Sequence, residues 1–237
     1  MGRAYQNRKA SMAKTAATKT KVYSRYGREL YMAAKSGGTD PHGNLTLRGL
    51  IERAKRDQVP THVIEKAIEK ASGGVGEDYY PALYEGFGPG GTMILIDCLT
   101  DNPNRTIGDV RTCFNRTKCK LGTQGTVSHM FDHMAIFSFN GDEESVLDAL
   151  LGSDVDVSDV ENDNGQVTVF VPNTEYGKAK QALTATFADI EFEVDEIQYV
   201  PRNSTPISGD DIAVMDKLIE MLEDVDDVQN VYHDAEY

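Results

Sequence analysis

The chain has 237 residues, of which 40% are hydrophobic and 8% aromatic, and its formal net charge is −14. This composition supplies enough apolar surface for packed cores and excludes a globally disordered chain. The three cysteines lack CxxC spacing, and no apolar run approaches the ~20 residues that span a bilayer. We therefore expect a soluble cytoplasmic protein with reduced thiols, no signal peptide and no membrane partner.

Charge is divided unevenly along the chain. Residues 1–70 carry fifteen Lys and Arg against six Asp and Glu, a balance of +9, whereas residues 71–237 carry nine against thirty-two, a balance of −23. A basic segment joined to an acidic body is typical of proteins that bind a polyanion. We therefore expect the first seventy residues to contain the polyanion-binding region of the protein.

The predicted elements begin with a basic arm and three short helices. Residues 1–20 contain almost no large apolar side chains, so they are expected to form an arm without a core. Apolar residues then recur with helical spacing in three stretches of residues 21–76. Gly37-Gly38 is expected to end the first helix, and Thr46 and Thr61 are the expected N-caps of the second and third. This segment predicts a three-helix domain.

A middle α/β domain is expected to follow. Residues 80–87 and 92–99 are predicted strands, residues 104–119 a helix and residues 126–131 a further strand. The C-terminal residues predict one helix and one strand, which are too little for a core of their own. We therefore expect residues 77–132 and 206–237 to form one discontinuous domain.

Residues 133–205 predict a compact unit inside that domain. Its strands and helices follow the order β-α-β-β-α-β, with the second strand at 155–160 and the last at 190–200, which is the ferredoxin-like arrangement. The predicted fold class is therefore α+β. It has three domains: an N-terminal three-helix domain and two α/β domains, the last a ferredoxin-like βαββαβ unit inserted in the middle domain.

The basic head supplies the candidate nucleic-acid-binding residues. Lys and Arg neutralise phosphates, and interleaved tyrosines can stack on bases. The predicted residues are Arg3, Arg8, Lys9, Lys14, Lys19, Lys21, Arg25, Arg28, Lys35, Arg48, Arg53, Lys55 and Arg56. A solvated helix surface is the ordinary alternative, but the charge division favours binding. No helix-turn-helix, zinc-finger or RNA-recognition signature accompanies these residues, so we expect weak sequence specificity.

Three loops are the candidate site of a second hypothesis, an enzyme. Their candidate residues are Gly86, Gly88, Gly90, Asn102, Arg105, Thr106, Gly122 and Gly125. The glycine cluster lacks the Lys-Ser/Thr ending of a P-loop and precedes a strand, so a simple turn is the better interpretation. For residues 101–106, a functional loop and a turn with Asn104 or Thr106 as helix N-cap are about equally favoured. Convergence of the three loops would form a cleft.

No residue pattern predicts a metal or a cofactor. His129 and His133 lie four residues apart, but the flanking pattern is strand-like and no third ligand has suitable spacing. The many carboxylates lack calcium-loop spacing. We interpret them as a solvated acidic face that meets a protein partner or keeps the body of the protein away from the polyanion.

Four segments together resemble one family. They are residues 84–91 (YEGFGPGG), 98–106 (CLTDNPNRT), 121–126 (LGTQGT) and 222–232 (LEDVDDVQNVY). They are similar to the YebC/PmpR family, in its YeeN-like branch, and the likeness covers essentially the whole chain. The resemblance implies a helical N-terminal domain, two α/β domains with one inserted in the other, and no enzyme activity.

The resemblance also implies a function. Members are described as probable DNA-binding transcriptional regulators, which implies that role here. Bacterial members linked to ribosomal translation, and mitochondrial translational activators, imply the alternative of a translation factor that contacts rRNA or the ribosome. The family's usual opening, Gly-His-Ser-Lys-Trp, is replaced here by Arg3-Ala4-Tyr5 after Gly2, so no role tied to that opening carries over.

Overall fold

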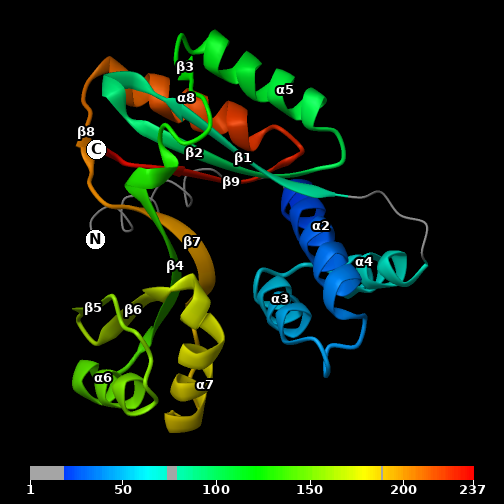
Figure 1. Cartoon of the computed structure of the whole chain (residues 1–237), viewed down its shortest axis with the longest axis vertical. Coiled ribbons are helices and arrows are strands. Elements are labelled where there is room, and N and C mark those ends of the chain that lie inside the picture. The colour runs from blue at the N-terminus through cyan, green and yellow to red at the C-terminus, as the bar shows by residue number, and fades with distance from the viewer. Residues whose placement is uncertain (1–18, 74–78, 188) are drawn as a thin grey trace. The chain divides into compact units, whose positions relative to one another are not determined.

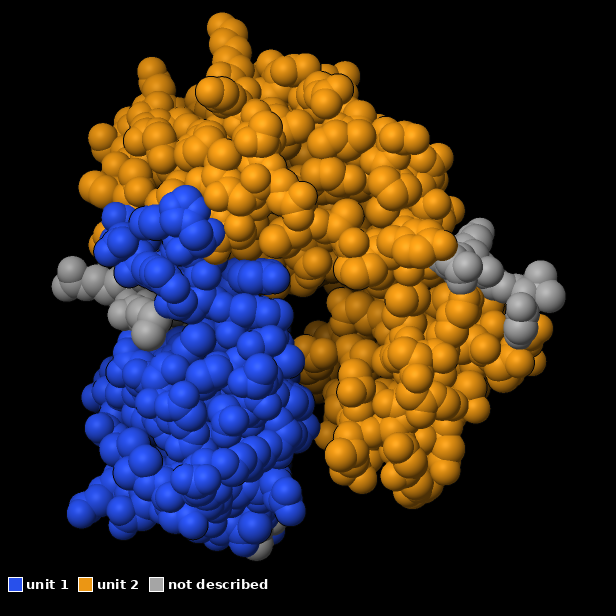
Figure 2. Space-filling view, viewed as in Figure 1, with its two compact units in different colours: residues 1–6, 129–204 blue, residues 7–128, 205–237 orange. Residues whose placement is uncertain are grey.

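The structure, a computed structural model, describes residues 19–73, 79–187 and 189–237. The predicted basic arm lies almost wholly outside the described residues. The described residues divide into two compact units, which Figure 2 colours separately. Residues 129–204 form one unit, and the rest of the described chain forms the other. The predicted α+β class is confirmed, because a helical region comes first and α/β regions follow.

Three helices open the larger unit: α2 (Lys19–Gly37), α3 (Leu45–Arg56) and α4 (Thr61–Ser72). Their apolar residues recur every three or four positions, so each helix carries one apolar stripe, and the stripes meet in a common core. The buried members of this helical core are Leu30, Ala33, Ala34, Leu47, Leu50, Ala54, Val59, Ile64 and Ala67.

The junction between α2 and α3 is capped at both helix ends. Gly38 adopts a left-handed conformation, with φ of 91°, directly after the last residue of α2, as the predicted glycine stop requires. Asn44 is the N-cap of α3, and its side-chain oxygen accepts a backbone N–H at 3.0 Å. The predicted caps were wrong: Thr46 lies inside α3, and Thr61 is the first residue of α4 after the N-cap Pro60.

A four-stranded sheet forms the other part of the larger unit. Its strands are β1 (Tyr80–Phe87), β2 (Met93–Thr100), β3 (Lys120–Leu121) and β9 (Val228–His233), in the order β3-β1-β2-β9 with antiparallel neighbours. Helices α5 (Pro103–Arg116) and α8 (Asp210–Glu223) lie on one face of this sheet (Figure 1). Strand β9, from the C-terminal part of the chain, thus pairs with β2, the second strand of the first hairpin. A short parallel pair, β8 (Thr205–Pro206) with β10 (Ala235–Glu236), completes the unit.

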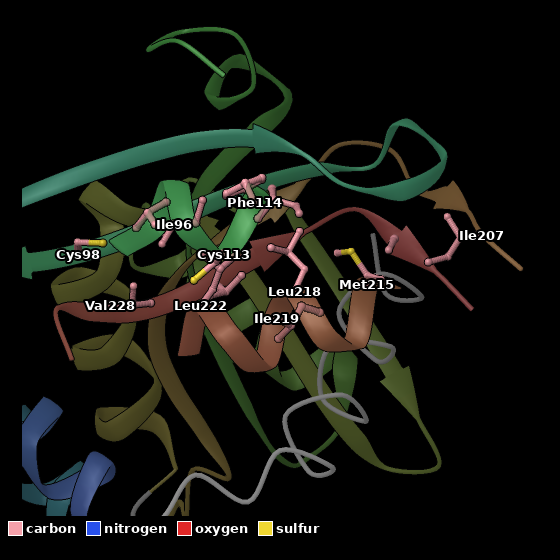
Figure 3. Close-up of a cluster of buried hydrophobic side chains, with 14 residues drawn as sticks. Ile96, Cys98, Cys113, Phe114, Ile207, Met215, Leu218, Ile219, Leu222 and Val228 are labelled. Atoms are coloured by element: carbon pink, nitrogen blue, oxygen red, sulfur yellow. The ribbon is translucent and has the colours of Figure 1, made fainter. Parts of the chain in front are cut away.

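Apolar side chains from β2, β9, α5 and α8 fill the space between sheet and helices (Figure 3). Ile96, Phe114, Leu218 and Leu222 are each at most 1% exposed in this core. Gly86 in β1 lies against Phe114, and a Cβ at that position would overlap the phenyl ring. The glycine therefore allows α5 to pack closely on the sheet.

The smaller unit has the strand order of a ferredoxin-like fold. Its elements are β4 (Phe131–Asn140), α6 (Glu143–Gly152), β5 (Asp159–Asp163), β6 (Gln166–Pro172), α7 (Tyr176–Thr186) and β7 (Val194–Pro201). The sheet order is β5-β6-β4-β7 and the neighbouring strands are antiparallel. Alternate residues of β4 and β6, such as Phe137 and Val169, face the helices and form the core of this unit.

Three predicted strand positions were wrong. Residues 126–131 do not form a strand: a 3₁₀ turn, Ser128–Met130, lies there, and β4 begins at Phe131. The strand expected at 155–160 is β5, which begins only at Asp159. The last strand begins at Val194 rather than Ile190: Ile190 and Phe192 pack against the core, but the paired register with β4 begins only at Val194. Apolar residues alone did not distinguish a paired strand from a packed loop.

Within the described parts of the chain, no helix combines the length and the apolar character that crossing a bilayer requires.

Candidate functional site

The structure describes part of the predicted basic set. Arg3, Arg8, Lys9 and Lys14 lie outside the described residues, and Lys19 is the first residue of α2, described only by its backbone. Lys35, Arg48, Lys55 and Arg56 are exposed, whereas Arg53 is half-buried. Lys21, Arg25 and Arg28 are half-buried and engaged within the protein. The assignment of these residues to a nucleic acid stays a prediction.

One side of α3 presents exposed cations. Arg48 and Lys55 each follow a buried residue, Leu47 and Ala54, so the 100° helical step turns them about 100° away from the buried side, and Arg56 lies farther round. Lys55 and Arg56 belong to the last helical turn, where positive charge also complements the helix dipole. The positive charge at the end of α3 therefore stabilises the helix, and the exposed side of α3 that carries it is also accessible to a polyanion.

The tyrosines that interleave with the basic residues are mostly used inside the protein. Tyr31 is only 3% exposed and lies edge-on to Tyr79, with ring centroids 5.8 Å apart. Tyr26 packs on the helical core and its hydroxyl donates to the Asp57 carboxylate. These two rings are therefore unavailable as stacking platforms in this conformation. Tyr5 lies outside the described residues.

A cationic stripe on α2, formed by Lys21, Arg25 and Arg28, contacts the α/β part of the same unit. The three positions are four and three residues apart, so they share one face of the helix. Arg25 Nη2 donates to Asn230 Oδ1 of β9 at 2.8 Å. Lys21 pairs with the Asp224 carboxylate. Arg28 Nη1 lies 3.1 Å from Asp227 Oδ1.

Asp227 is the centre of a buried polar cluster. Its side chain is 2% exposed. It accepts hydrogen bonds from Arg105 Nη2 at 2.8 Å, from Thr106 Oγ1 at 2.7 Å and from Thr100 Oγ1 at 3.2 Å. Its backbone carbonyl accepts the Leu99 N–H at 2.8 Å. The carboxylate thereby joins the end of β2 and the start of α5 to the turn before β9.

The electrostatics of Asp227 follow from these partners. Burial alone would raise the pKa of the carboxyl group, but hydrogen bonds from Arg105 and Thr106 and the charges of Arg105 and Arg28 outweigh burial, so the pKa lies below its ordinary value. The hydrogen bonds of Asp227 and Asp101 raise the pKa of Arg105 in turn. Both groups are therefore charged throughout the physiological range.

A polar groove with a volume of about 690 Å³ opens beside this cluster. It mixes three arginines with five aspartates, so it offers no single sign of charge to a ligand. The lining residues are Arg28, Tyr79, Asp101, Arg105, Asp109, Thr112, Cys113, Arg116, Met221, Asp224, Val225, Asp226 and Asp227. Burial raises the pKa of the Cys113 thiol, which keeps this thiol protonated and poorly nucleophilic.

A second buried carboxylate, Glu85, organises the loop after β3. Its oxygens accept the backbone N–H groups of Gly125, Val127 and Ser128 at 2.7, 2.5 and 3.0 Å. Burial would raise the pKa of Glu85, but these hydrogen bonds lower it below the ordinary value. Because the side chain captures these N–H groups, residues 125–128 curl around Glu85, and this explains the missing strand at 126–131.

The three candidate loops do not converge. In the β1–β2 hairpin Phe87 pairs with Met93 and Tyr80 with Thr100. The Gly86–Gly91 turn and the Asn102–Thr106 segment therefore lie at opposite ends of the hairpin, roughly 23 Å of strand apart. Residues 122–126 lie at the Gly86 end, because Gly122 N donates to Glu85 O at 2.7 Å. The expected single cleft is absent from the described chain.

The candidate loop residues have structural contacts instead. Asn102 is the N-cap of α5 and its side chain accepts the Arg105 N–H at 3.2 Å, so the predicted caps Asn104 and Thr106 were wrong. Gly125 has a φ of 86°, which only glycine adopts readily. A Cβ at Gly122 would lie 2.7 Å from Thr126 Oγ1. Gly88 and Gly90 shape the turn before β2, against Met215 and Ile207.

No group of three His, Cys, Asp or Glu side chains in the described ranges has the geometry of a metal site. His129 and His133 lie on a 3₁₀ turn and on β4, and His133 stacks on Tyr199 with centroids 4.3 Å apart. Sequence reasoning missed the two organising carboxylates, Glu85 and Asp227. The signal that could have found them was their position inside the family-like segments 84–91 and 222–232.

Comparisons with known proteins give matches over the whole chain. A family model described as the TACO1/YebC protein N-terminal domain matches residues 3–74, and one described as the TACO1/YebC second and third domain matches residues 79–235. A relative from Marinobacter nauticus is 70% identical over all of this chain and 98% of its own length. A relative from Alcanivorax borkumensis is 68% identical over all of this chain and 99% of its own. Both are named "probable transcriptional regulatory protein".

A solved structure is also similar. The crystal structure of a conserved hypothetical protein from Aquifex aeolicus superposes with a TM-score of 0.79 at 30% sequence identity. The match covers 94% of this chain and 93% of that one. The likeness therefore extends across the helical and the α/β regions.

Proposed function

Because the chain belongs to the TACO1/YebC family, we propose that it is a non-catalytic, DNA-binding regulator of transcription that contacts phosphates through its helical N-terminal region. The shared name of the relatives, probable transcriptional regulatory protein, supports this proposal. The division of the chain into three domains, with residues 133–205 inserted in the middle one, is part of the same proposal.

The main observation behind this proposal is that one side of α3 is both exposed and basic. Arg48, Lys55 and Arg56 are exposed there, while the apolar side of α3 is buried in the helical core. Residues 71–237 carry a balance of −23, so a polyanion is attracted to the helical region and repelled by the remainder. Contacts of this kind supply affinity with little sequence choice.

The proposal is tested by the salt dependence of binding to duplex DNA. The triple variant Arg48→Gln, Lys55→Gln, Arg56→Gln should bind more weakly, and the slope of log affinity against log salt should fall by roughly 0.9 for each phosphate that the variant no longer neutralises. The control replaces three exposed cations of the α/β part, Arg111→Gln, Lys120→Gln and Lys217→Gln, and changes the net charge equally. Its slope should match that of the unmodified protein.

Equal slopes for the α3 variant and the control would contradict the proposal. Binding to structured RNA that survives an excess of duplex DNA would instead favour the translation factor that contacts rRNA or the ribosome. An acidic surface that meets a protein partner is compatible with either target and is tested separately by partner capture with the intact chain.

A further inference from the structure

The cationic stripe of α2 is already neutralised by the protein. Its partners belong to an acidic turn, defined here as residues 223–227, and to the neighbouring strands β9 and β2. Lys21 Nζ pairs with Asp224 and lies 3.4 Å from the Glu223 carbonyl oxygen. Arg28 donates to the Asp226 carbonyl and to Leu99 O at 3.4 Å, besides its pairing with Asp227. Carboxylates and carbonyls here occupy the positions that phosphate oxygens would take around the same cations.

The contacts of the stripe with the acidic turn and β9 are ionic and polar. Leu30, Ala33 and Ala34 of α2 belong to the core shared with α3 and α4, and Tyr31, also buried, lies against Tyr79. Asp224 is exposed, at 67% of its side chain, so its pairing with Lys21 is screened by salt and open to competition. A polyanion presents many such charges at once.

Release of the stripe would leave no uncompensated charge behind. Asp227, the most buried acid of the turn, keeps three hydrogen bonds from Arg105 and one each from Thr100 and Thr106 when Arg28 departs. Arg28 also lies over the ring of Tyr79, 5.5 Å from its centroid, which supports the guanidinium from the other side. The hydrogen bonds around Asp227 would therefore remain when the stripe is released.

We propose that the acidic turn is an internal competitor of nucleic-acid phosphate for the cationic stripe of α2. With the turn engaged, Lys21 and Arg28 are withheld by it, Arg25 is withheld by Asn230 of the neighbouring β9, and only the other basic residues of the helical region contact the ligand. A ligand with enough phosphates displaces the turn and recruits the stripe. The proposal rests on the proposed function, because it concerns the regulation of the same interface.

The test is the affinity of the full chain for duplex DNA after neutralising the turn with Asp224→Asn and Asp226→Asn. Both side chains are exposed, so the fold is retained. We expect binding about five- to tenfold tighter, with a salt slope steeper by roughly 1 for each stripe cation that reaches a phosphate. The matched control is Glu144→Gln with Asp148→Asn on α6, which removes two exposed acidic charges elsewhere.

A second pair of variants ties the effect to the stripe. Lys21→Gln with Arg25→Gln should lower the affinity of the unmodified chain only slightly, but should abolish the gain in the Asp224→Asn, Asp226→Asn background. Equal gains for the turn variant and the α6 control would overturn the inference, and the α3 dependence would still support the proposed function. No salt-dependent binding by any variant would overturn both.

Discussion

Asp227 shows what a single buried carboxylate contributes to this protein. It lies between two arginines and two threonines that come from α2, β2 and α5, and its backbone carbonyl binds β2. A charge at 2% side-chain exposure is tolerated because every direction around it holds a donor. Removal of that charge would leave two guanidinium groups facing an amide that carries donors of its own.

We therefore expect Asp227→Asn to lower the free energy of unfolding by about 2–4 kcal/mol near neutral pH. The folded-state pKa of Asp227 lies below the ordinary value of 3.8, so its contribution is fully present above that value and is lost as the pH falls through the folded pKa. The difference between variant and unmodified protein in urea denaturation should shrink in acid. The control Asp226→Asn should change stability by less than about 0.5 kcal/mol. A difference that persists unchanged in acid would contradict this assignment.

At the scale of elements, Asn44 links α2 to α3. Its side-chain oxygen caps α3, and its Nδ2 donates to the carbonyl oxygens of Ala33 and Gly38, each at 2.8 Å. The Asn44 side chain is buried, with 6% of the residue exposed. One side chain therefore supplies hydrogen bonds to backbone carbonyls at the end of α2 and to a backbone N–H at the start of α3.

Asn44→Ala should cost about 2–3 kcal/mol of unfolding free energy, because it removes the N-cap and the Nδ2 donor that the carbonyl oxygens of Ala33 and Gly38 share. Thr46→Ala is the matched control, since Thr46 is exposed in the first turn of the same helix. The control should lose less than about 0.5 kcal/mol. Chemical denaturation measures both, and equal losses would argue against the capping role of Asn44.

At the scale of the whole molecule, the chain leaves the larger unit after Ser128 and returns to it at Thr205. The two passages are adjacent, because Phe131 and Pro201 are direct partners on β4 and β7, roughly 5 Å apart. The smaller unit also has a core of its own. A segment with adjacent ends and an independent core behaves as an insertion.

Replacement of residues 129–204 by a short Gly-Ser linker should therefore leave a larger unit that unfolds cooperatively and keeps its salt-dependent DNA binding. Thermal unfolding followed by circular dichroism, together with the binding assay, measures both. As a control, truncation before β9 should abolish cooperative unfolding, because Val228 and Val231 belong to the sheet core. Loss of folding after the linker replacement would mean that the two units depend on each other.

Much of the fold and little of the candidate site was predictable from local pattern. Helical periodicity placed α2, α3 and α4, and the β-α-β-β-α-β order identified the ferredoxin-like unit, because both depend on side chains near one another in the chain. The strand expected at 126–131 failed because Glu85, some forty positions away in the chain, captures the backbone groups that a strand would use. The caps failed for a smaller reason, since several polar residues near a helix start can cap it and packing selects one.

The charge division between residues 1–70 and the remainder, the α+β class and the family resemblance all came from the amino-acid order, because composition and local pattern carry them. Long-range contacts decide which basic side chains are neutralised inside the protein and which are exposed to solvent. Two groups of cations look alike in the sequence: Lys21, Arg25 and Arg28 on α2, and Arg48, Lys55 and Arg56 on α3. The α2 group contacts an acidic turn and its neighbouring strand some two hundred residues away in the chain. The α3 group lies on an exposed side of its helix. The sequence shows that a residue is charged, but the partner that neutralises this charge is set by the fold.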